Sequence, residues 1–352
     1  MSRQATADIV SDIAVSAEVN HAVLLERIEL DLALVSECIE RQVDSSTPDL
    51  DGVLRDFCLH PGKRIRPRLL LLSSYLGNAH SASATAAAAA IEIVHNASLV
   101  HDDLIDNSLE RRGVPCLQVT KGSSCSILYG DLLFGSAISL LAKQGNAQAV
   151  GVMSRAIERM ACGELLQQEQ VGMFELDLAA YQQIVSCKTG ALLSAAMELG
   201  GLFGGCDARQ CAALRTAGEK LGIAFQVCDD IGDYLHSRER QGRDPGNDVS
   251  DRKITAPLIF ARQWADVATA QRLAENFAAA ARDAVQFPHL LEAIHQSQGF
   301  ARACDFAERM FDDGIAELDV FGKSEASDLL IQFINGLMLS LTSGYSVTGT
   351  RQ

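Results

Sequence analysis

Apolar residues recur at helical spacing in two long stretches of the chain. In ATAAAAAIEIVHNASLVHDDLID, Ile91, Val94, Ser98 and Asp102 follow one another at intervals of three or four residues, which is the period of one helix face. YQQIVSCKTGALLSAAMELGGLFGG has the same pattern and ends in glycines, a common helix stop. We therefore predict long helices over both stretches, and we expect the alanine run at 85–90 to be buried.

The distribution of prolines supports a helical protein. The chain has seven prolines and none between Pro115 and Pro245, and continuous helices require such a span because proline breaks a helix interior. No series of alternating strands bounded by hairpin turns is apparent. We predict an all-α fold, a single bundle forming one domain over residues 1–352, with ragged ends at roughly 1–20 and 344–352. Loops near Pro48 and Pro245 are predicted to separate helices rather than domains.

Composition narrows the class of protein. A net charge of −15 disfavours a nucleic-acid partner, because phosphate binding needs a basic surface. The opening residues MSRQATADIVSDIAV lack a basic start followed by an apolar run, so no signal peptide is expected. The longest uncharged apolar stretch, around residues 69–76, is too short to cross a bilayer. The ten cysteines include no CxxC pair and are expected to be reduced. We predict a cytoplasmic protein without an integral membrane segment.

Two acidic clusters interrupt the apolar pattern. SLVHDDLIDNSLERRG places Asp102, Asp103 and Asp106 directly after an apolar lead-in, and helical spacing puts these carboxylates on one rim. An isolated DDxxD is more often a solvated helix face. Its functional alternative is a site for a hard cation such as Mg²⁺, which prefers oxygen ligands and bridges to phosphate.

A second copy of this spacing favours the functional alternative. FQVCDDIGDY repeats the cluster with Asp229, Asp230 and Asp233, again behind apolar residues. Two such clusters in one chain are unlikely to arise by chance, and they could face one another across a cavity. A third acidic pair, Asp312 and Asp313, lacks the third carboxylate and is predicted to lie on the surface.

The ligand of such a site would carry phosphate, yet no phosphate-binding loop is present. The chain has neither a Walker A motif nor GxGxxG, the usual glycine-rich signatures. Basic side chains occur elsewhere, and each alone is more often a surface charge: Lys63, Arg64, Arg66, Arg111, Arg112, Lys188, Arg243, Arg252 and Lys253.

Taken together, these motifs resemble those of the trans-isoprenyl (polyprenyl) diphosphate synthases. The resemblance runs from about Gly62 to Pro257, and its parts follow in the family's order: GKRIRP, HNASLVHDDLIDNSLERRG, YGD, GELLQ, KTG, FQVCDDIGDY and GRDPGNDVSDRKITAP. It implies a bundle of long helices around a deep central cavity, and mostly a homodimer. It also implies a reaction in which an allylic diphosphate ionises and isopentenyl diphosphate attacks the resulting cation.

The resemblance assigns the acidic clusters to metal binding. It implies several Mg²⁺ ions, with Mn²⁺ as a possible substitute, held by Asp102, Asp106 and Asp229. Asp103 and Asp230 would be additional or water-mediated ligands, as would Asp233. Neutralising the charge of the leaving diphosphate is the main catalytic need.

The basic residues receive substrate roles by the same resemblance. The allylic diphosphate would be held by Arg111, Lys188, Gln226 and Lys253, with Thr189 stabilising the cation. Isopentenyl diphosphate would be held by Lys63, Arg66, His95 and Arg112, with Gly62 shaping the loop. Four positions depart from the usual pattern: Arg243 replaces a lysine phosphate ligand, Arg252 replaces a glycine, Gly232 stands where a large apolar residue is more usual, and Gln118 stands where histidine is common. His101 is predicted to be structural.

Small residues below the first cluster bear on product length. Ala97 and Ser98 precede Asp102 by five and four residues, where short-chain members of the family commonly carry an aromatic side chain. We therefore expect a product of twenty carbons or more, with the floor set further down by residues such as Leu133 or Phe134. The alternative is that these small residues only allow close helix packing.

Two other functions stay open at this point. A class I terpene cyclase shares the fold and one aspartate-rich motif, but it lines its pocket with aromatic residues, and this chain is only 5% aromatic. A non-catalytic partner subunit of a prenyl synthase typically loses aspartates, and here all six are present.

Overall fold

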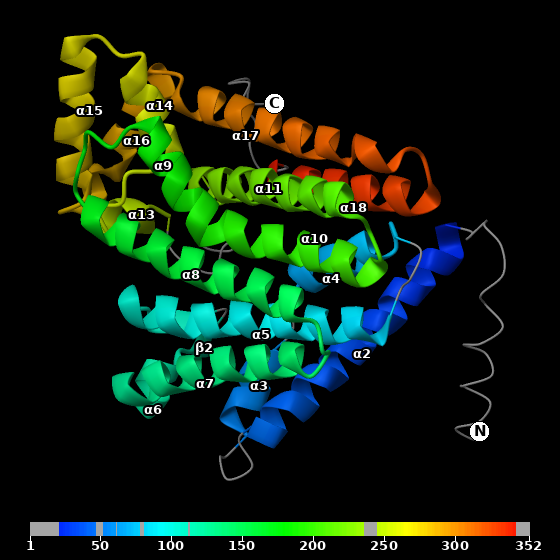
Figure 1. Ribbon diagram of the computed structural model, residues 1–352. Coiled ribbons are helices and arrows are strands. Elements are labelled where there is room, and N and C mark those ends of the chain that lie inside the picture. Colours follow the sequence, from blue (N-terminus) through cyan, green and yellow to red (C-terminus); the bar gives the residue numbers. More distant parts are fainter. Residues whose placement is uncertain are drawn as a thin grey trace, which may run out of the picture.

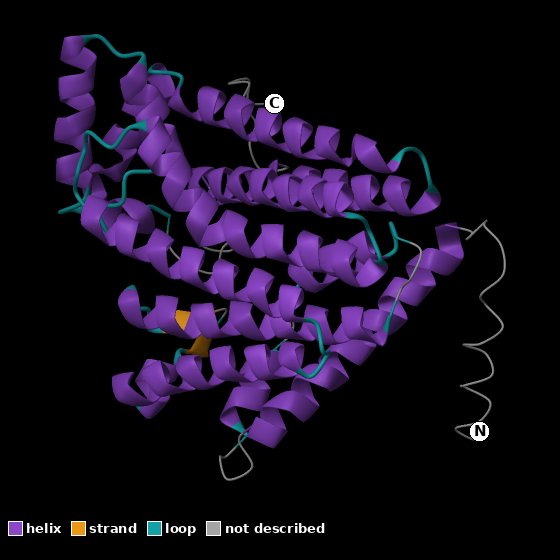
Figure 2. Cartoon of the chain, in the orientation of Figure 1, coloured by secondary structure: helices purple, strands orange, loops and turns teal. Residues whose placement is uncertain are grey.

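The computed structural model describes residues 21–46, 52–60, 62–77, 81–111, 113–235 and 245–342. The described chain is almost entirely helical (Figure 2), and its strands are two antiparallel residue pairs. The all-α prediction is therefore confirmed. The predicted ragged ends at 1–20 and 344–352 lie outside the described residues.

The helices are arranged as a bundle whose long members run side by side (Figure 1). The first half of the chain contains α2 (His21–Ser46), α3 (Val53–Leu59), α4 (Ile65–Ser74), α5 (Ala82–Ile105), α6 (Leu117–Lys121), α7 (Ser123–Ala142) and α8 (Ala147–Gln170). A short hairpin, β1 (Glu110–Arg111) and β2 (Val114–Pro115), follows α5.

The second half continues the bundle and adds a group of shorter helices. It contains α9 (Leu178–Val185), η1 (Ser186–Gly190), α10 (Ala191–Gly204), α11 (Ala208–Leu235), α13 (Asn247–Ser250), α14 (Ala256–Gln263), α15 (Val267–Ala280), η2 (Ala284–Gln286), α16 (Phe287–Gln296), α17 (Gly299–Ala316), η3 (Glu317–Phe321) and α18 (Glu325–Thr342). Helices α5 and α11 both end at the left of Figure 1, which brings their acidic motifs to one end of the bundle.

Helix α10 is the centre of the core. Leu193 and Met197 belong to the apolar cluster around α11, α14 and α17, whereas Leu192 and Leu199 belong to the cluster around α5, α7 and α8. The helix ends at Gly205, whose φ of 80° is the left-handed conformation that glycine adopts without strain. The run at 85–90, which is Thr85 followed by five alanines, is buried in α5, as predicted.

The predicted helix over 181–205 is present, but it is not continuous. Its residues Ser186–Gly190 form a π-helical turn between α9 and α10. Such turns are rare and occur mostly at functional sites. Lys188 and Thr189 of the KTG motif lie inside this turn.

Helix α7 corrects one expectation about apolar segments. Its 20 residues make it long and apolar enough to cross a membrane, by length and composition alone, so residues 69–76 are not the longest apolar stretch. Core helices of soluble proteins also pass this test. Only 39% of its most apolar window is buried within the chain, and Leu128 is 65% exposed. Much of one face of α7 is therefore free of contacts with the described residues.

Candidate active site

The first acidic motif closes helix α5. Asp102 is partly buried, Asp103 is 2% exposed, and Asp106 is the residue at which the helix ends. The Arg111 guanidinium, on β1, donates to both oxygens of Asp103, with Nε at 2.9 and 3.0 Å and Nη2 at 2.6 Å from Oδ1. Lys253 Nζ lies 2.9 Å from Oδ1 of Asp106. Two of the three carboxylates thus have a cationic partner in direct contact.

Gln118 supports the turn that follows this motif. Its Nε2 donates to the backbone oxygens of Asp103, at 2.7 Å, and Ser108, at 2.5 Å. These carbonyls lie at and beyond the end of α5, where a helix leaves its last oxygens without intrahelical donors. Gln118 therefore ties α6 to the acidic motif through the backbone.

The second acidic motif lies near the end of α11 and has a different environment. Asp229 is exposed, whereas Asp230 is 4% exposed and accepts hydrogen bonds from the Tyr181 hydroxyl at 2.5 Å and from Gln226 Nε2 at 2.8 Å. Asp233 is fully buried and accepts from the backbone N–H of Asp248 at 3.0 Å. The hydrogen bonds that Asp230 and Asp233 accept here come from neutral donors.

Two lysines lie beside the α5 motif. Lys188 Nζ is 2.6 Å from Oε2 of Glu164 and donates to Gln167 at 2.7 Å. Burial lowers the pKa of Lys188, but the charges of Glu164 and Asp102 outweigh it and the pKa is raised overall. Lys253 behaves in the same way, with Asp106 as the main opposing charge. Both ammonium groups therefore stay charged at neutral pH.

The π-helical turn is linked to α11 by side-chain hydrogen bonds. Thr189 Oγ1 donates to Oε1 of Gln226 at 2.6 Å, and Gln226 donates onward to Asp230. These hydrogen bonds, together with the one from Tyr181 to Asp230, join four side chains into one network: Thr189, Gln226, Asp230 and Tyr181. It explains why Gln226, one turn before the acidic motif, is placed on the same face.

The predicted second anion pocket is only partly in view. Gly62 and Lys63 are exposed before α4, and Arg66 on α4 has a buried Nε without a hydrogen-bond partner. Burial lowers the pKa of Arg66, while the charges of Glu92 and Asp102 act in the opposite direction. His95 lies on α5, seven residues before the acidic motif. Two predicted ligands of phosphate, Arg112 and Arg243, lie outside the described residues.

Arg64, between these residues, makes structural contacts instead. Its Nη1 is 3.0 Å from Oε1 of Glu92, and its Nη2 donates to the backbone oxygen of Cys58 at 3.1 Å. Its φ of 46° is the left-handed conformation, uncommon for a residue with a side chain. The arginine that the sequence left unassigned is thus an anchor of the loop.

The acidic groups suit a hard divalent cation in their chemistry but do not form a ready coordination shell. Among the described residues, no three His, Cys, Asp or Glu side chains are gathered closely enough to hold an ion. Burial raises the pKa of Asp102 to about 6, with Glu164 and Asp106 adding to the effect and Lys188 opposing it. Asp233 keeps one buried oxygen, Oδ1, without a hydrogen-bond partner. An added cation would stabilise these carboxylates, so the residues fit a metal.

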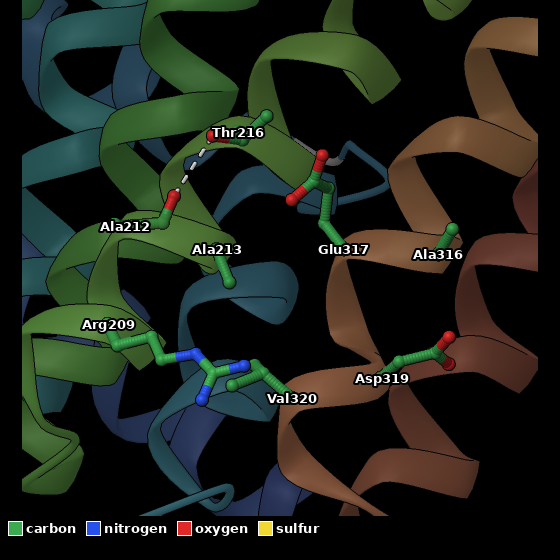
Figure 3. Close-up of a pocket in the computed structure, with 8 residues that line it drawn as sticks. All are labelled: Arg209, Ala212, Ala213, Thr216, Ala316, Glu317, Asp319 and Val320. Carbon is green, nitrogen blue, oxygen red and sulfur yellow. Dashed lines mark hydrogen bonds between the residues drawn. The ribbon is translucent and has the colours of Figure 1, made fainter.

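A separate surface hollow does not belong to this site. Figure 3 shows it between α11 and the start of η3, with Arg209 and Thr216 on one side and Glu317 and Asp319 on the other; its volume is about 380 Å³. Thr216 precedes Asp229 by 13 residues on one helix, which corresponds to about 20 Å.

Comparison with known proteins places the chain in a family. A model of the polyprenyl synthetase family matches residues 47–294, more than half of the chain. The chain belongs to this family. Polyprenyl synthetases are prenyltransferases, so the resemblance inferred from the motifs is confirmed.

Individual relatives and one solved structure agree with this family. The chain is 31% identical over 312 residues to the octaprenyl diphosphate synthase of Escherichia coli, covering 86% of this chain and 93% of that protein. It is 33% identical over 245 residues to a short chain isoprenyl diphosphate synthase of Methanothermobacter thermautotrophicus, covering 68% and 75%. A polyprenyl synthase from Caulobacter crescentus, complexed with calcium and isoprenyl diphosphate, superposes with a TM-score of 0.81 at 29% identity, covering 91% and 98%.

Several residues of this polyprenyl synthetase site were not singled out from the sequence. Glu164 and Gln167 lie in the GELLQ motif, which was noted without a role, and the contact with Lys188 now supplies one. Tyr181 carried no motif signal, because its partner Asp230 is 49 residues away in the chain. Only the packing of α9 against α11 brings that pair together.

His101 and the third acidic pair lie where they were expected. A ring nitrogen of His101 is 3.1 Å from the backbone oxygen of Ile127 on α7, and its ring lies 5.7 Å from that of Phe134. The histidine therefore joins α5 to α7, in agreement with a structural role. Asp312 and Asp313 are exposed on α17.

Proposed function

We propose that this polyprenyl synthetase condenses isopentenyl diphosphate head-to-tail with an allylic diphosphate to make a trans-polyprenyl diphosphate. The observation that carries the proposal is that Lys188 and Lys253 lie beside the α5 motif, at the end of the bundle where α11 also ends. Lys253 contacts Asp106 directly, and Lys188 lies within electrostatic reach of Asp102. Cations and carboxylates in this arrangement suit an anion that is held through metal ions.

We assign Asp102, Asp106 and Asp229 to direct contact with Mg²⁺, for which Mn²⁺ can substitute. Divalent cations bound there would neutralise the charge that develops on the leaving diphosphate. Asp103 and Asp230 are buried against Arg111, Tyr181 and Gln226, which favours a supporting role for both. Asp233 supports the turn at residues 246–248, because its side chain accepts from the backbone N–H of Asp248 and its backbone oxygen accepts from that of Gly246.

The substrate pockets are assigned to two sets of cations. Lys188 and Lys253 would bind the allylic diphosphate, because both are partly buried, charged and beside the α5 motif. Because Nε and Nη2 of Arg111 are engaged with Asp103, we assign Arg111 mainly a positioning role. Thr189 and Gln226 would orient the allylic group. Isopentenyl diphosphate would bind beside Lys63, Arg66 and His95, with Gly62 in the loop and Arg112 added from outside the described residues. The buried Arg66 Nε without a partner supports that second pocket.

We propose a product of twenty carbons or more. Identity alone does not choose a length, because the octaprenyl and the short chain relatives are almost equally similar. Ser98 is partly buried on the helix face of Asp102, whereas Ala97 is fully buried in the cluster that includes Leu133, with Phe134 packed against it. An aromatic ring at Ser98 would therefore enter the path of the growing prenyl product with less repacking of the helices than a ring at Ala97. Ser98→Phe should shorten the product while condensation continues.

The quaternary structure and location are part of the proposal. We propose that the protein is a cytoplasmic homodimer whose subunits, each one domain, meet along α7. Ile127 and Leu128 are exposed there, Asp131 is the helix's one charged residue, and Gly135 allows close approach. A second copy suits this apolar face better than a bilayer, because His101 and the rest of α5 cover its other side. Light scattering of the native chain and of Leu128→Glu tests it.

One assay separates this function from its alternatives. The purified chain is incubated with Mg²⁺, isopentenyl diphosphate and five-, ten- or fifteen-carbon primers, and the products are identified by mass spectrometry. Elongated diphosphates are expected. A non-catalytic partner subunit would give no product, and a class I terpene cyclase would release a hydrocarbon or an alcohol.

A further inference from the structure

The π-helical turn between α9 and α10 is held in place by the backbones of two neighbouring helices. A Cβ added to Gly163 on α8 would lie 2.7 Å from the backbone nitrogen of Lys188. A Cβ added to Gly222 on α11 would lie 2.5 Å from the Cα of Gly190. Real Cβ atoms do not approach so closely, so these two helices touch the turn only because they have glycine there.

A three-residue polar network fastens the same turn from its first residue. Arg159 Nη2, on α8, donates to Ser186 Oγ at 2.7 Å and to Oε1 of Glu219, on α11, at 2.6 Å. The Ser186 hydroxyl donates to the same Glu219 carboxylate. Three elements that are distant in the sequence therefore share one set of hydrogen bonds: α8, the turn and α11.

Charge keeps the network intact at neutral pH. Burial alone raises the pKa of Glu219, but hydrogen bonds from Arg159 and Ser186 outweigh burial and the pKa is lowered overall. Arg159 and Glu219 are each about one third exposed, at 37% and 33%. An ion pair of that exposure adds little to global stability, so its value must lie in local geometry.

The network does not include the side chains that it would control. Lys188 contacts Glu164 and Gln167, and Thr189 contacts Gln226. Ser186 precedes them by two and three residues. A rotation of the turn at Ser186 would therefore displace both side chains from these contacts.

We propose that Arg159, Ser186 and Glu219 are positioning residues that hold the π-helical turn in the register that directs Lys188 and Thr189 toward the acidic motifs. The effect on catalysis rests on the proposed function, in which these two residues meet the allylic diphosphate. The effect on the turn itself does not. The two consequences are therefore measured separately.

The variants are Glu219→Gln and Ser186→Ala, with Ser186→Thr restoring the hydroxyl. The matched control is Glu317→Gln, because Lys220, the next residue on α11, pairs with Glu317 at 2.9 Å and similar exposure, at 28% and 35%. That pair joins α11 to η3 (Figure 3 shows Glu317) and touches no part of the turn. Both pairs thus test an ion pair on α11, and only one involves the turn.

Hydrogen–deuterium exchange of the full-length protein measures the turn directly. Amides of residues 186–190 should exchange about tenfold faster in Glu219→Gln and Ser186→Ala than in the native chain, and Glu317→Gln and Ser186→Thr should stay at the native rate. Unchanged exchange in both test variants overturns the proposal, whether or not the chain proves to be a synthase.

Steady-state kinetics measure the consequence for the reaction. The test variants should raise KM for the allylic diphosphate and lower kcat, each by about tenfold, while KM for isopentenyl diphosphate stays native. Equal losses toward both substrates, or losses matched by Glu317→Gln, would mean that the network supports the fold in general. Absence of condensation by the native chain would instead reject the proposed function, and the exchange data would still decide the positioning role.

Discussion

The two acidic motifs have the same spacing but are balanced by different groups. At the end of α5, Asp103 is paired with the Arg111 guanidinium and Asp106 with Lys253. At the end of α11, Asp230 accepts from a hydroxyl and an amide, and Asp233 accepts from a backbone N–H through one of its two oxygens. The buried carboxylate of the α5 motif is thus paired with a cation, whereas the hydrogen bonds given for the buried carboxylates of the α11 motif come from neutral donors.

The difference indicates that the two acidic motifs have different roles in the site. Arg111 and Lys253 fix the conformation of the α5 motif in the absence of a ligand, so this motif should change little when a ligand binds. Buried carboxylates with neutral donors remain costly to ionise, and burial indeed raises the pKa of Asp230. The α11 motif should therefore gain more from an added divalent cation than the α5 motif does.

The largest expected effect is on turnover. Replacing Asp102 or Asp229 with alanine should reduce kcat/KM by about a thousandfold or more, because charge neutralisation of the leaving diphosphate supplies much of the catalysis. Steady-state assays at saturating Mg²⁺ measure it. If Asp102→Ala retained most of the native activity while Asp229→Ala lost it, we would conclude that only the α11 motif binds the metal.

Stability should separate the second aspartate of a motif from the first. Asp103→Ala leaves the Arg111 guanidinium partly buried without its partner and should cost about 2–3 kcal/mol in the free energy of unfolding. Asp229→Ala removes an exposed side chain and should change that free energy by less than about 0.5 kcal/mol. Urea unfolding of both variants without metal tests the contrast, and equal losses would contradict it.

The pH dependence of metal binding at the α5 motif should be set by Asp102. Its pKa of about 6 in the metal-free protein is above the ordinary value, so ionised Asp102 opposes folding above pH 6 and this cost disappears as the pH falls toward 4. A metal ion requires the ionised form. Apparent Mn²⁺ affinity should therefore be constant above pH 6 and fall about tenfold per unit below it. Calorimetry measures the affinity at each pH. If the affinity of Asp102→Asn fell with pH in the same way, the group that is protonated would not be Asp102.

The last prediction concerns a neutral donor of the α11 motif. Tyr181→Phe removes one hydrogen bond from buried Asp230 and leaves the one from Gln226, so it should cost about 1 kcal/mol of stability. The matched change at the other motif is Arg111→Met, which leaves the buried Asp103 without its cation and should cost about 3 kcal/mol. Chemical unfolding ranks the two, and the reverse order would mean that countercharge is not what distinguishes the motifs.

Much of the fold followed from local pattern. The 3.6-residue period of α5, the proline-free span and the glycines that end α10 are properties of neighbouring residues, and each predicted its helix correctly. The six aspartates were found for the same reason, because their spacing is local. The π-helical turn was missed, since Ser186–Gly190 has no local signal that distinguishes it from an α-helix.

The sequence by itself determined the residue types and spacings of the candidate site: the acidic motifs, Lys188, Lys253 and the helices that hold them. Only the tertiary structure decided which carboxylates are already neutralised. That choice depends on partners such as Tyr181 for Asp230, 49 residues away, and Lys253 for Asp106, 147 residues away. Countercharge and burial are set by what packs nearby in space, and a repeated spacing along the chain contains no information about them.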